Sequence, residues 1–287
     1  MNEAKKTVLI AGAGGLLGRA MTARLAASCS VAAFSHNDLD ITNREQVEAI
    51  IKRTRPDTVI NCAATADVDR CEIDTTWAYA VNEDGPRWLA RYARLTDAEI
   101  AHVSTDYVFD GEKEGFYTQR DEPNPLSVYA KSKLAGERAA RSENERAYII
   151  RTSWIFGAGG KNFGSRVVEL ARAGAHIKGV TDQTSIPTYA PDLAARIEEI
   201  INRGQHGLYH VTSTGVTSWH DFARLALDMS GFGHIEIEKV TRADLRQLAP
   251  RPRNSAMRCL LSEQIGLAPL RHWKDTLQEF LYESSKN

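Results

Sequence analysis

The chain has 287 residues, of which 43% are hydrophobic and 25% charged, enough apolar material for a sizeable core. Its 36 basic and 37 acidic residues give a formal net charge of −1, which excludes the strongly basic surface that binds nucleic acid or an acidic membrane. The four cysteines are scattered without a CxxC motif, and no apolar run approaches the ~18 residues of a membrane span. We therefore expect a reduced, cytoplasmic protein with no signal segment and no membrane or nucleic-acid partner.

Short apolar, β-branched runs alternate with helix-like patterns through the first half of the chain. In chain order, the runs predict strands at residues 7–11, 31–34, 57–63, 99–104 and 147–154. The intervening patterns predict helices at residues 14–27, 43–54 (with Asn43 as N-cap), 75–95 and 127–141. Near-continuous apolar strands separated by helices indicate a parallel sheet covered on both faces, and right-handed crossovers make that sheet doubly wound. The predicted fold class is therefore α/β.

After about residue 155 the alternation loosens, and glycines and prolines cluster between the apolar runs. Two further helices are predicted near residues 217–229 and 273–283, and both carry aromatic residues. We expect this half to contain one late strand pair and a smaller lobe that covers a substrate. The chain is also expected to return from this lobe to the sheet.

The first predicted strand leads into the turn GAGGLLG at residues 12–18. The commonest dinucleotide fingerprint, G-x-G-x-x-G/A, needs a small residue where Leu17 stands, so it does not match. The pattern G-x-x-G-x-x-G does match, through Gly12, Gly15 and Gly18. Glycines permit a tight turn and the close approach of a pyrophosphate, and the next helix offers its N-terminal N–H groups to phosphate. The strand–turn–helix context favours dinucleotide binding over a glycine-rich turn that holds no ligand.

The end of the second predicted strand bears on the choice of cofactor. An acidic residue there would bind the 2′-hydroxyl of NAD, but residues 34–36 carry no carboxylate. Arg19 could reach the 2′-phosphate of NADP, or it could be a solvated charge on the helix. We expect NADPH, with NADH as the alternative because Asp38 and Asp40 follow closely.

The segment PLSVYAKSKLAGE places Tyr129 and Lys133 on one face of a predicted helix. An ammonium group near the phenol would lower the phenol pKa from about 10, which suits Tyr129 to transfer a proton. Ser104 and Thr105 stand at the end of an earlier strand, at the edge where open α/β sheets bind ligands, and both are expected to bond a substrate oxygen. YxxxK alone could be a chance pair, but the glycine turn, the strand-end hydroxyls and YxxxK in this order indicate a dehydrogenase-type site.

With these motifs the sequence resembles the extended short-chain dehydrogenase/reductase family, and within it the dTDP-4-dehydrorhamnose reductases. The resemblance extends along almost the whole chain. Its segments include DLDITN (38–43), RPDTVINCAA (55–64), AYAVNEDG (78–85), STDYVFDG (104–111), PNPLSVYAKSKLAGE (123–137), RTSWIFGAGGKNF (151–163), DQTSIPTYAPDLA (182–194), GLYHVTSTGVTSWHDFA (207–223) and APRPRNSAM (249–257). It implies a Rossmann-type NAD(P)-binding domain at 1–155, to which later segments return, and a lobe at 156–287 that mainly binds substrate.

The resemblance also implies roles for individual residues. Those implied to contact the cofactor are Gly12, Gly15, Leu16, Leu17, Asp40, Ile41, Ala63, Ala64, Thr65, Tyr129 and Lys133. Those implied to contact the substrate are Thr105, Asp106, Trp154, Asn162 and Arg251. Of these, Asn162 and Arg251 are candidates for its diphosphate, because an arginine fork suits phosphate.

In the implied reaction, the nicotinamide delivers hydride to the C4 ketone of a nucleotide-linked 6-deoxy sugar. Tyr129 donates the proton, Thr105 donates a hydrogen bond to the ketone oxygen, and Lys133 bonds the nicotinamide ribose and tunes Tyr129. The expected substrate is dTDP-4-dehydro-L-rhamnose, and a homodimer is the expected assembly.

Two positions depart from the family pattern. Where family members read AAYTAVD, this chain reads AATADVD, so Ala66 and Asp67 leave the sugar and the nucleotide base open. Ala20 stands where some members carry an acidic residue that binds magnesium between subunits, so no metal is expected.

Several residues have simpler interpretations. Trp154 could be a core residue and Arg251 a surface charge, whereas Trp219 is expected to pack within the lobe. The stretch DVDRCEID at 67–74 is expected to be a solvated helix start. The histidines at positions 36, 102, 210 and 220 are not spaced as a metal-ligand cluster.

Three functions are compatible with the sequence. The leading one is the NADPH-dependent 4-ketoreductase. The second is a related nucleotide-sugar reductase or epimerase, whereas a 4,6-dehydratase is disfavoured because Tyr107 stands where dehydratases usually carry Glu. The third is a non-catalytic regulatory subunit like that of methionine adenosyltransferase, a family relative with the same motifs.

Overall fold

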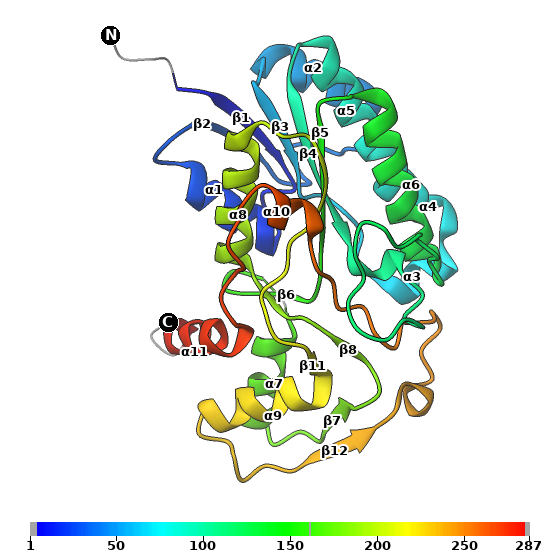
Figure 1. Ribbon diagram of the computed structural model, residues 1–287, viewed down its shortest axis with the longest axis vertical. Coiled ribbons are helices and arrows are strands. Elements are labelled where there is room, and N and C mark those ends of the chain that lie inside the picture. Colours follow the sequence, from blue (N-terminus) through cyan, green and yellow to red (C-terminus); the bar gives the residue numbers. More distant parts are fainter. Residues whose placement is uncertain (1–4, 161, 285–287) are drawn as a thin grey trace.

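The computed structural model describes residues 5–160 and 162–284, and Figure 1 shows a sheet with helices above a smaller lobe. The sheet has six parallel strands in the order β2–β1–β3–β4–β5–β10. Their bounds are β1 (Thr7–Ala11), β2 (Ser30–Phe34), β3 (Thr58–Asn61), β4 (Glu99–Thr105), β5 (Ala147–Thr152) and β10 (Gly207–His210). The predicted α/β class with a parallel sheet is confirmed.

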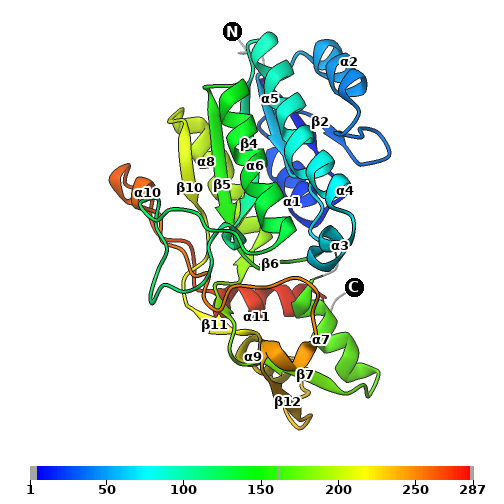
Figure 2. The same cartoon turned by 90° about the vertical axis from the view of Figure 1, so that its right-hand side faces the viewer.

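Helices cover both faces of the sheet, as Figure 2 shows from the side. Alternate residues of a strand point to opposite faces, so Val8 and Ile10 pack with helices α1 (Leu16–Leu25) and α8 (Ala190–Arg203). Leu9 and Ala11 pack on the other face. The helices on that face are α2 (Arg44–Thr54), α5 (Gly85–Leu95) and α6 (Val128–Glu143). Burial on both faces is why these strands have near-continuous apolar sequences.

The strand order sets the position of the ligand crevice. Strand β1 pairs with β2 on one side and β3 on the other, so the direction of winding reverses between β1 and β3. In open α/β sheets, ligands bind beyond the carboxyl ends of the strands at such a switch point. The glycine turn that follows β1 lies at this place.

The predicted helix at 75–95 is continuous but irregular. It consists of α4 (Thr75–Tyr79), a π-helical turn (Ala80–Asp84) and α5. A Cβ on Gly136 of α6 would overlap the carbonyl oxygen of Asn82, so α6 packs directly against the backbone of this turn. The predicted N-cap of α2 is confirmed, since the Asn43 side chain accepts the N–H of Gln46.

The smaller lobe has its own aromatic core. It contains α7 (Phe163–Arg172), α9 (Trp219–Met229) and α11 (Trp273–Ser284), and β7 (Ile177–Val180) pairs with β12 (Ile237–Val240). The rings of Phe156, Tyr189, Phe222, Trp273 and Phe280 pack together there. The helices predicted near 217–229 and 273–283 are therefore confirmed.

The expectation of one late strand pair is wrong, because the described residues after 155 form three short strand pairs, and a further strand, β10, joins the large sheet beside β5. The other late strands are short pairs outside it, too short to show a strand periodicity in the sequence. Besides β7 with β12, they are β6 (Ile155–Phe156) with β9 (Thr188–Tyr189), and β8 (Thr184–Ser185) with β11 (Thr217–Ser218). The remaining elements are α3 (Val68–Ile73), α10 (Leu260–Gln264) and two short 3₁₀ turns, Asp106–Val108 and Arg242–Leu245. Across the described ranges, no helix combines the length and apolar character needed to cross a bilayer.

Candidate active site

Two glycines of the turn are required by the close packing around them. Gly12 has φ +81°, and a Cβ there would lie 2.5 Å from the backbone nitrogen of Ala63. A Cβ on Gly18 would overlap the carbonyl oxygen of Gly12. Gly15 caps α1 without a side-chain hydrogen bond, and the first turn of α1 carries no acidic residue. The N-terminal N–H groups of α1 therefore remain available for an anion.

A cavity of about 620 Å³ adjoins this turn at the switch point of the sheet. It is lined by the segments that follow β1, β2 and β3 and by two side chains of the helix beyond them. The lining residues are Gly12, Gly14, Gly15, Ser35, His36, Asn37, Leu39, Asp40, Ile41, Thr42, Cys62, Ala63, Ala64, Thr65, Ala66, Asp67, Trp77 and Val81. Seven of the residues predicted to contact the cofactor are among them.

The two leucines predicted to line a pyrophosphate point elsewhere. The Leu17 side chain is buried in the core beneath the sheet, and Leu16 packs against Gly160. Only their backbone N–H groups remain for such a contact. Apolar side chains at these positions are explained by core packing.

Both carboxylates near the second strand end have local partners. Asp38 accepts hydrogen bonds from the backbone and the hydroxyl of Ser35, and these bonds lower its pKa. Asp40 accepts hydrogen bonds from the backbone and hydroxyl of Thr42. Arg19 donates from Nε to the carbonyl of Gly14 at 3.0 Å, so its guanidinium lies beside the glycine turn.

The loop after β3 is held by Asn82, a residue that the sequence motifs did not single out. Its fully buried side chain accepts the N–H of Thr65 at 3.0 Å and donates to the Thr65 carbonyl at 3.2 Å. It also donates to the Ser132 hydroxyl on α6 at 3.0 Å. Asn82 thus ties the cavity-lining loop to the helix that carries Tyr129. The one sequence signal that could have pointed to Asn82 was its position within the segment AYAVNEDG.

Tyr129 and Thr105 meet at the end of β4. The Thr105 hydroxyl faces the Tyr129 phenol, and it donates a hydrogen bond to Asp106 at 3.2 Å. Tyr107 packs edge-to-face against Tyr129, with ring centroids 6.0 Å apart, and Tyr129 is 9% exposed. Burial raises the pKa of Tyr129 well above its ordinary value.

The expectation that Lys133 lowers the pKa of Tyr129 is wrong in this structure. The two residues share a face of α6, but the Lys133 ammonium donates to the backbone carbonyl of Val103 at 2.7 Å. Burial lowers the pKa of Lys133 to about 8, although Glu137 opposes the shift. Desolvation of each group outweighs any attraction between them, because both lie in the interior.

The expected substrate role of Ser104 is also wrong. Its hydroxyl donates to the buried carboxylate of Glu137 at 2.5 Å, on the opposite side of β4 from Thr105. Glu137 in turn forms a bidentate ion pair with Arg151, at 2.9 and 2.7 Å. Successive strand residues face opposite ways, so only one of the two hydroxyls can reach the site.

Asp106 is fully enclosed beside Thr105. Its carboxylate accepts hydrogen bonds from Ser185 at 3.0 Å and from Ser255, both in the second half of the chain. Burial raises the pKa of Asp106 to about 6, and these hydroxyl contacts oppose the shift. The side chain predicted to lie beside the substrate therefore holds Thr105 and two distant segments together.

Trp154 and Asn162 have partners within the protein. Trp154 has φ +41° and stacks on Trp219, with ring centroids 3.6 Å apart. Asn162 caps α7 by accepting the N–H of Ser165, and its amide donates to the carbonyls of Gly157 and Gly160. Their predicted contacts with substrate stay predictions.

Arg251 is neither a free surface charge nor isolated. Its guanidinium pairs with both carboxylate oxygens of Asp69 on α3, at 3.2 and 3.0 Å. Asp69 also accepts the backbone N–H of Ala249 at 3.0 Å. The interpretation of residues 67–74 as only a solvated helix start is therefore wrong, because this helix binds a segment 182 residues away.

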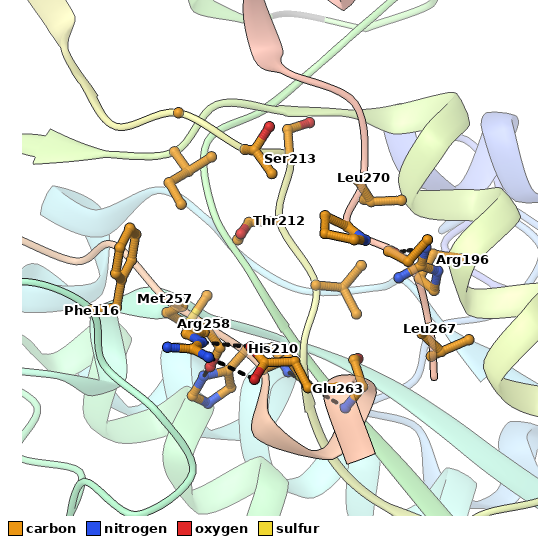
Figure 3. A pocket seen from close by; sticks show the side chains of 18 residues that line it. Phe116, Arg196, His210, Thr212, Ser213, Met257, Arg258, Glu263, Leu267 and Leu270 are labelled. Atoms are coloured by element: carbon orange, nitrogen blue, oxygen red, sulfur yellow. Dashed lines mark hydrogen bonds and ion pairs between the residues drawn. The ribbon is translucent and has the colours of Figure 1, made fainter. Parts of the chain in front are cut away.

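A second cavity, of about 240 Å³, lies beyond the end of β10 (Figure 3). The ion pair of Arg258 with Glu263 lies at its wall, and the His210 ring contacts the Arg258 carbonyl at 3.1 Å. Burial lowers the pKa of His210 to about 3, so its ring is neutral. None of the predicted site residues lines this cavity. Within the described ranges, no three His, Cys, Asp or Glu side chains are grouped to hold a metal ion.

A glycine turn at the switch point, a cavity beside it, and a Tyr–Thr pair at the end of β4 together define a Rossmann-type oxidoreductase. The comparisons place the chain more narrowly. The family described as RmlD substrate binding domain matches residues 6–286, and the chain belongs to it. The resemblance seen in the sequence motifs is confirmed.

The chain is similar to proteins whose activity is named. It is 38% identical to a dTDP-4-dehydrorhamnose reductase of Aggregatibacter actinomycetemcomitans, over 94% of this chain and 97% of that protein. A crystal structure of a dTDP-4-dehydrorhamnose reductase from Clostridium acetobutylicum is 37% identical and superposes with a TM-score of 0.94, covering 97% of this chain and 99% of that one. A Bacillus anthracis dTDP-4-dehydrorhamnose reductase, solved in complex with NADP, is 32% identical with a TM-score of 0.94 and the same coverage.

Proposed function

We propose that this protein is an NADPH-dependent reductase that converts dTDP-4-dehydro-L-rhamnose to dTDP-L-rhamnose. The observation that carries the proposal is the buried Thr105–Tyr129 pair at the end of β4, in a chain that matches dTDP-4-dehydrorhamnose reductases along nearly its full length. The residue roles below, and the division into a cofactor domain at 1–155 and a mainly substrate-binding lobe at 156–287, are part of this proposal.

The residues around the glycine turn fit a dinucleotide. The N–H groups of the first turn of α1 lack a side-chain cap and would hold the pyrophosphate. Asp40 and Ile41 would flank the adenine, and residues 63–65 would lie along the nicotinamide half. Arg19, beside the turn, supports NADPH over NADH, because Asp38 is already bonded to Ser35. When bound, NADPH supplies the hydride.

The chemistry asked of Tyr129 is the donation of a proton to the forming alkoxide. Its pKa is raised by burial, so the hydroxyl keeps its proton at neutral pH and can act as the general acid. Thr105 has one hydroxyl hydrogen, now given to Asp106, and would redirect it to the substrate O4. Lys133 is anchored on the Val103 carbonyl with two ammonium hydrogens left for a ribose hydroxyl.

The proposal is tested by incubating the purified protein with dTDP-4-dehydro-L-rhamnose and following the loss of absorbance of NADPH or NADH. We expect turnover with NADPH, and a ~10²–10⁴-fold lower kcat for Tyr129→Phe. Tyr92→Phe, a buried tyrosine of α5 away from the site, is the matched control and should keep full activity.

Other results of the same assay would favour one of the alternative functions. Turnover of a related keto sugar alone would replace the substrate but keep the reaction. No turnover of any keto sugar would refute catalysis and favour the regulatory subunit. Sedimentation at assay concentrations tests the proposed homodimer.

A further inference from the structure

The guanidinium of Arg251 is held so that one of its edges stays open. A guanidinium has five N–H groups: one on Nε and two on each Nη. Nη1 donates to Asp69 and to the carbonyl of Ala249, at 3.2 and 2.9 Å, and Nη2 donates to Asp69 at 3.0 Å. In the part of the chain that the structure describes, this leaves Nε–H and the second Nη2–H without partners. These two N–H groups are parallel and lie on the same edge of the fork.

The segment that carries Arg251 is also fixed by contacts that do not involve Asp69. Arg242 donates from Nη1 to the Arg251 carbonyl at 2.6 Å. The backbone N–H of Arg242 is bonded to Asp182 at 2.8 Å, and its Nε to the same carboxylate at 3.3 Å. These contacts hold the backbone of Arg251 from one side, and Asp69 holds the Ala249 N–H from the other. The direction of the Arg251 side chain is set by the Asp69 carboxylate and the Ala249 carbonyl.

The pair lies near the cofactor cavity and near Tyr107, the neighbour of the catalytic phenol. Asp69 is on α3, two positions after the cavity-lining residue Asp67. The charges of Asp69 and Arg251 both act on Tyr107, whose ring packs against Tyr129. The side chains of Arg251 and Asp69 are 13% and 39% exposed, so the fork is largely shielded while its partner still touches solvent.

We propose that Asp69 is a positioning residue: it orients Arg251 so that the Nε–Nη2 edge receives one phosphate of the substrate's diphosphate. The inference rests on the proposed nucleotide-sugar function and adds to it the residue that orients the phosphate ligand. A bidentate phosphate contact needs two parallel N–H groups, which is the pair that Asp69 leaves open. The alternative is that Asp69 competes with the phosphate for the Arg251 guanidinium. In that case the removal of Asp69 should lower the KM for the sugar nucleotide.

The test compares Asp69→Ala, Asp69→Asn, Arg251→Ala and the double variant Asp69→Ala/Arg251→Ala. The readouts are kcat, the KM values for dTDP-4-dehydro-L-rhamnose and NADPH, and the Kd of thymidine diphosphate by calorimetry. We expect Arg251→Ala to raise the KM for the sugar nucleotide and the Kd of thymidine diphosphate roughly 10- to 100-fold. Asp69→Ala should raise both about fivefold, because Arg251 must then be ordered by the ligand itself.

Three further results are required. Asp69→Asn, which keeps an oxygen acceptor, should fall between wild type and Asp69→Ala. The double variant should match Arg251→Ala within about twofold, because Asp69 reaches the phosphate only through the Arg251 side chain. The kcat and the KM for NADPH should stay within about twofold in Asp69→Ala, since a phosphate contact away from C4 contributes uniform binding.

The matched control is Asp192→Ala. It breaks another bidentate ion pair, between Arg271 and Asp192 at 2.9 and 2.6 Å, neither residue of which lines the cofactor cavity, and it should leave all constants unchanged. An unchanged or lowered KM in Asp69→Ala, or additive effects in the double variant, would overturn the positioning role. Wild-type protein that neither turns over the sugar nucleotide nor binds thymidine diphosphate would instead overturn the proposed function, and the inference with it.

Discussion

The buried ion pair between Glu137 and Arg151 allows a quantitative prediction. The two side chains are only 6% and 3% exposed, and they are joined by two hydrogen bonds of 2.9 and 2.7 Å. Glu137 also accepts the Ser104 hydroxyl at 2.5 Å, and the Arg151 guanidinium lies 5.2 Å from the Phe109 ring centroid. Replacing Glu137 by Leu leaves a buried cation without its counter-charge.

Breaking such a pair from one side costs about 3–5 kcal/mol of unfolding free energy, because the remaining charge is neither hydrated nor paired. With a urea dependence near ~3 kcal/mol per M, Glu137→Leu should lower the midpoint of urea unfolding by about 1–2 M. The double variant Glu137→Leu/Arg151→Met removes both charges and should recover most of the loss, since a well-packed apolar pair is often as stable as a buried ion pair.

The matched control is Glu263→Gln, which breaks a bidentate pair with Arg258 whose side chains are 46% and 57% exposed. It should cost less than about 1 kcal/mol, because water replaces the lost contact. The measurement is urea unfolding followed by tryptophan fluorescence. A loss below about 1 kcal/mol for Glu137→Leu, or a double variant no more stable than the single one, would refute the reasoning.

Three further predictions concern the site. Gly12→Ala should destabilise the fold and weaken NADPH binding at least about tenfold, because φ is +81° and the new Cβ meets Ala63. The control Gly174→Ala, with φ +62° but open space around it, should cost only about 1–2 kcal/mol of unfolding free energy. Equal losses of thermal stability and of NADPH affinity in the two variants would contradict the close packing at Gly12. Asn82→Ala should cost about 1–3 kcal/mol in urea unfolding, since it leaves the Thr65 backbone unpaired in the interior, and a neutral result would count against its anchoring role. Burial raises the pKa of Asp106 to about 6, above the ordinary value of 3.8, so the folded state binds its proton more tightly and its contribution to stability falls as pH rises from about 4 to about 6. The melting temperature of wild type minus that of Asp106→Asn should therefore be larger at pH 4.5 than at pH 7.5, and a constant difference would contradict the raised pKa.

Much of the fold could be predicted because its signals are local. The strands of the sheet have near-continuous apolar runs, and the helices between them begin at caps such as Asn43. The π-helical turn and the short strand pairs had no such signal. They arise where separate elements meet, as α6 does with the carbonyl of Asn82 through Gly136.

The residues of the candidate site also differ in how far the sequence could predict them. The spacing of residues along the chain was sufficient to predict the turn from Gly12 to Gly18 and the Tyr129–Lys133 pair. It could not predict that Lys133 would bond the Val103 carbonyl or that Ser104 would donate to the Glu137 carboxylate. These contacts depend on which polar groups are buried away from water when the chain folds.

The sequence by itself therefore determined the fold class, the family and the chemistry-bearing motifs, because each depends on residues a few positions apart. Only the tertiary structure decided the partners of the charges and the direction of the pKa shifts. Asp69 meets Arg251 across 182 residues, and Asp106 meets Ser255 across 149. A pKa follows from burial and from every neighbouring charge, and both are set only when distant segments pack together.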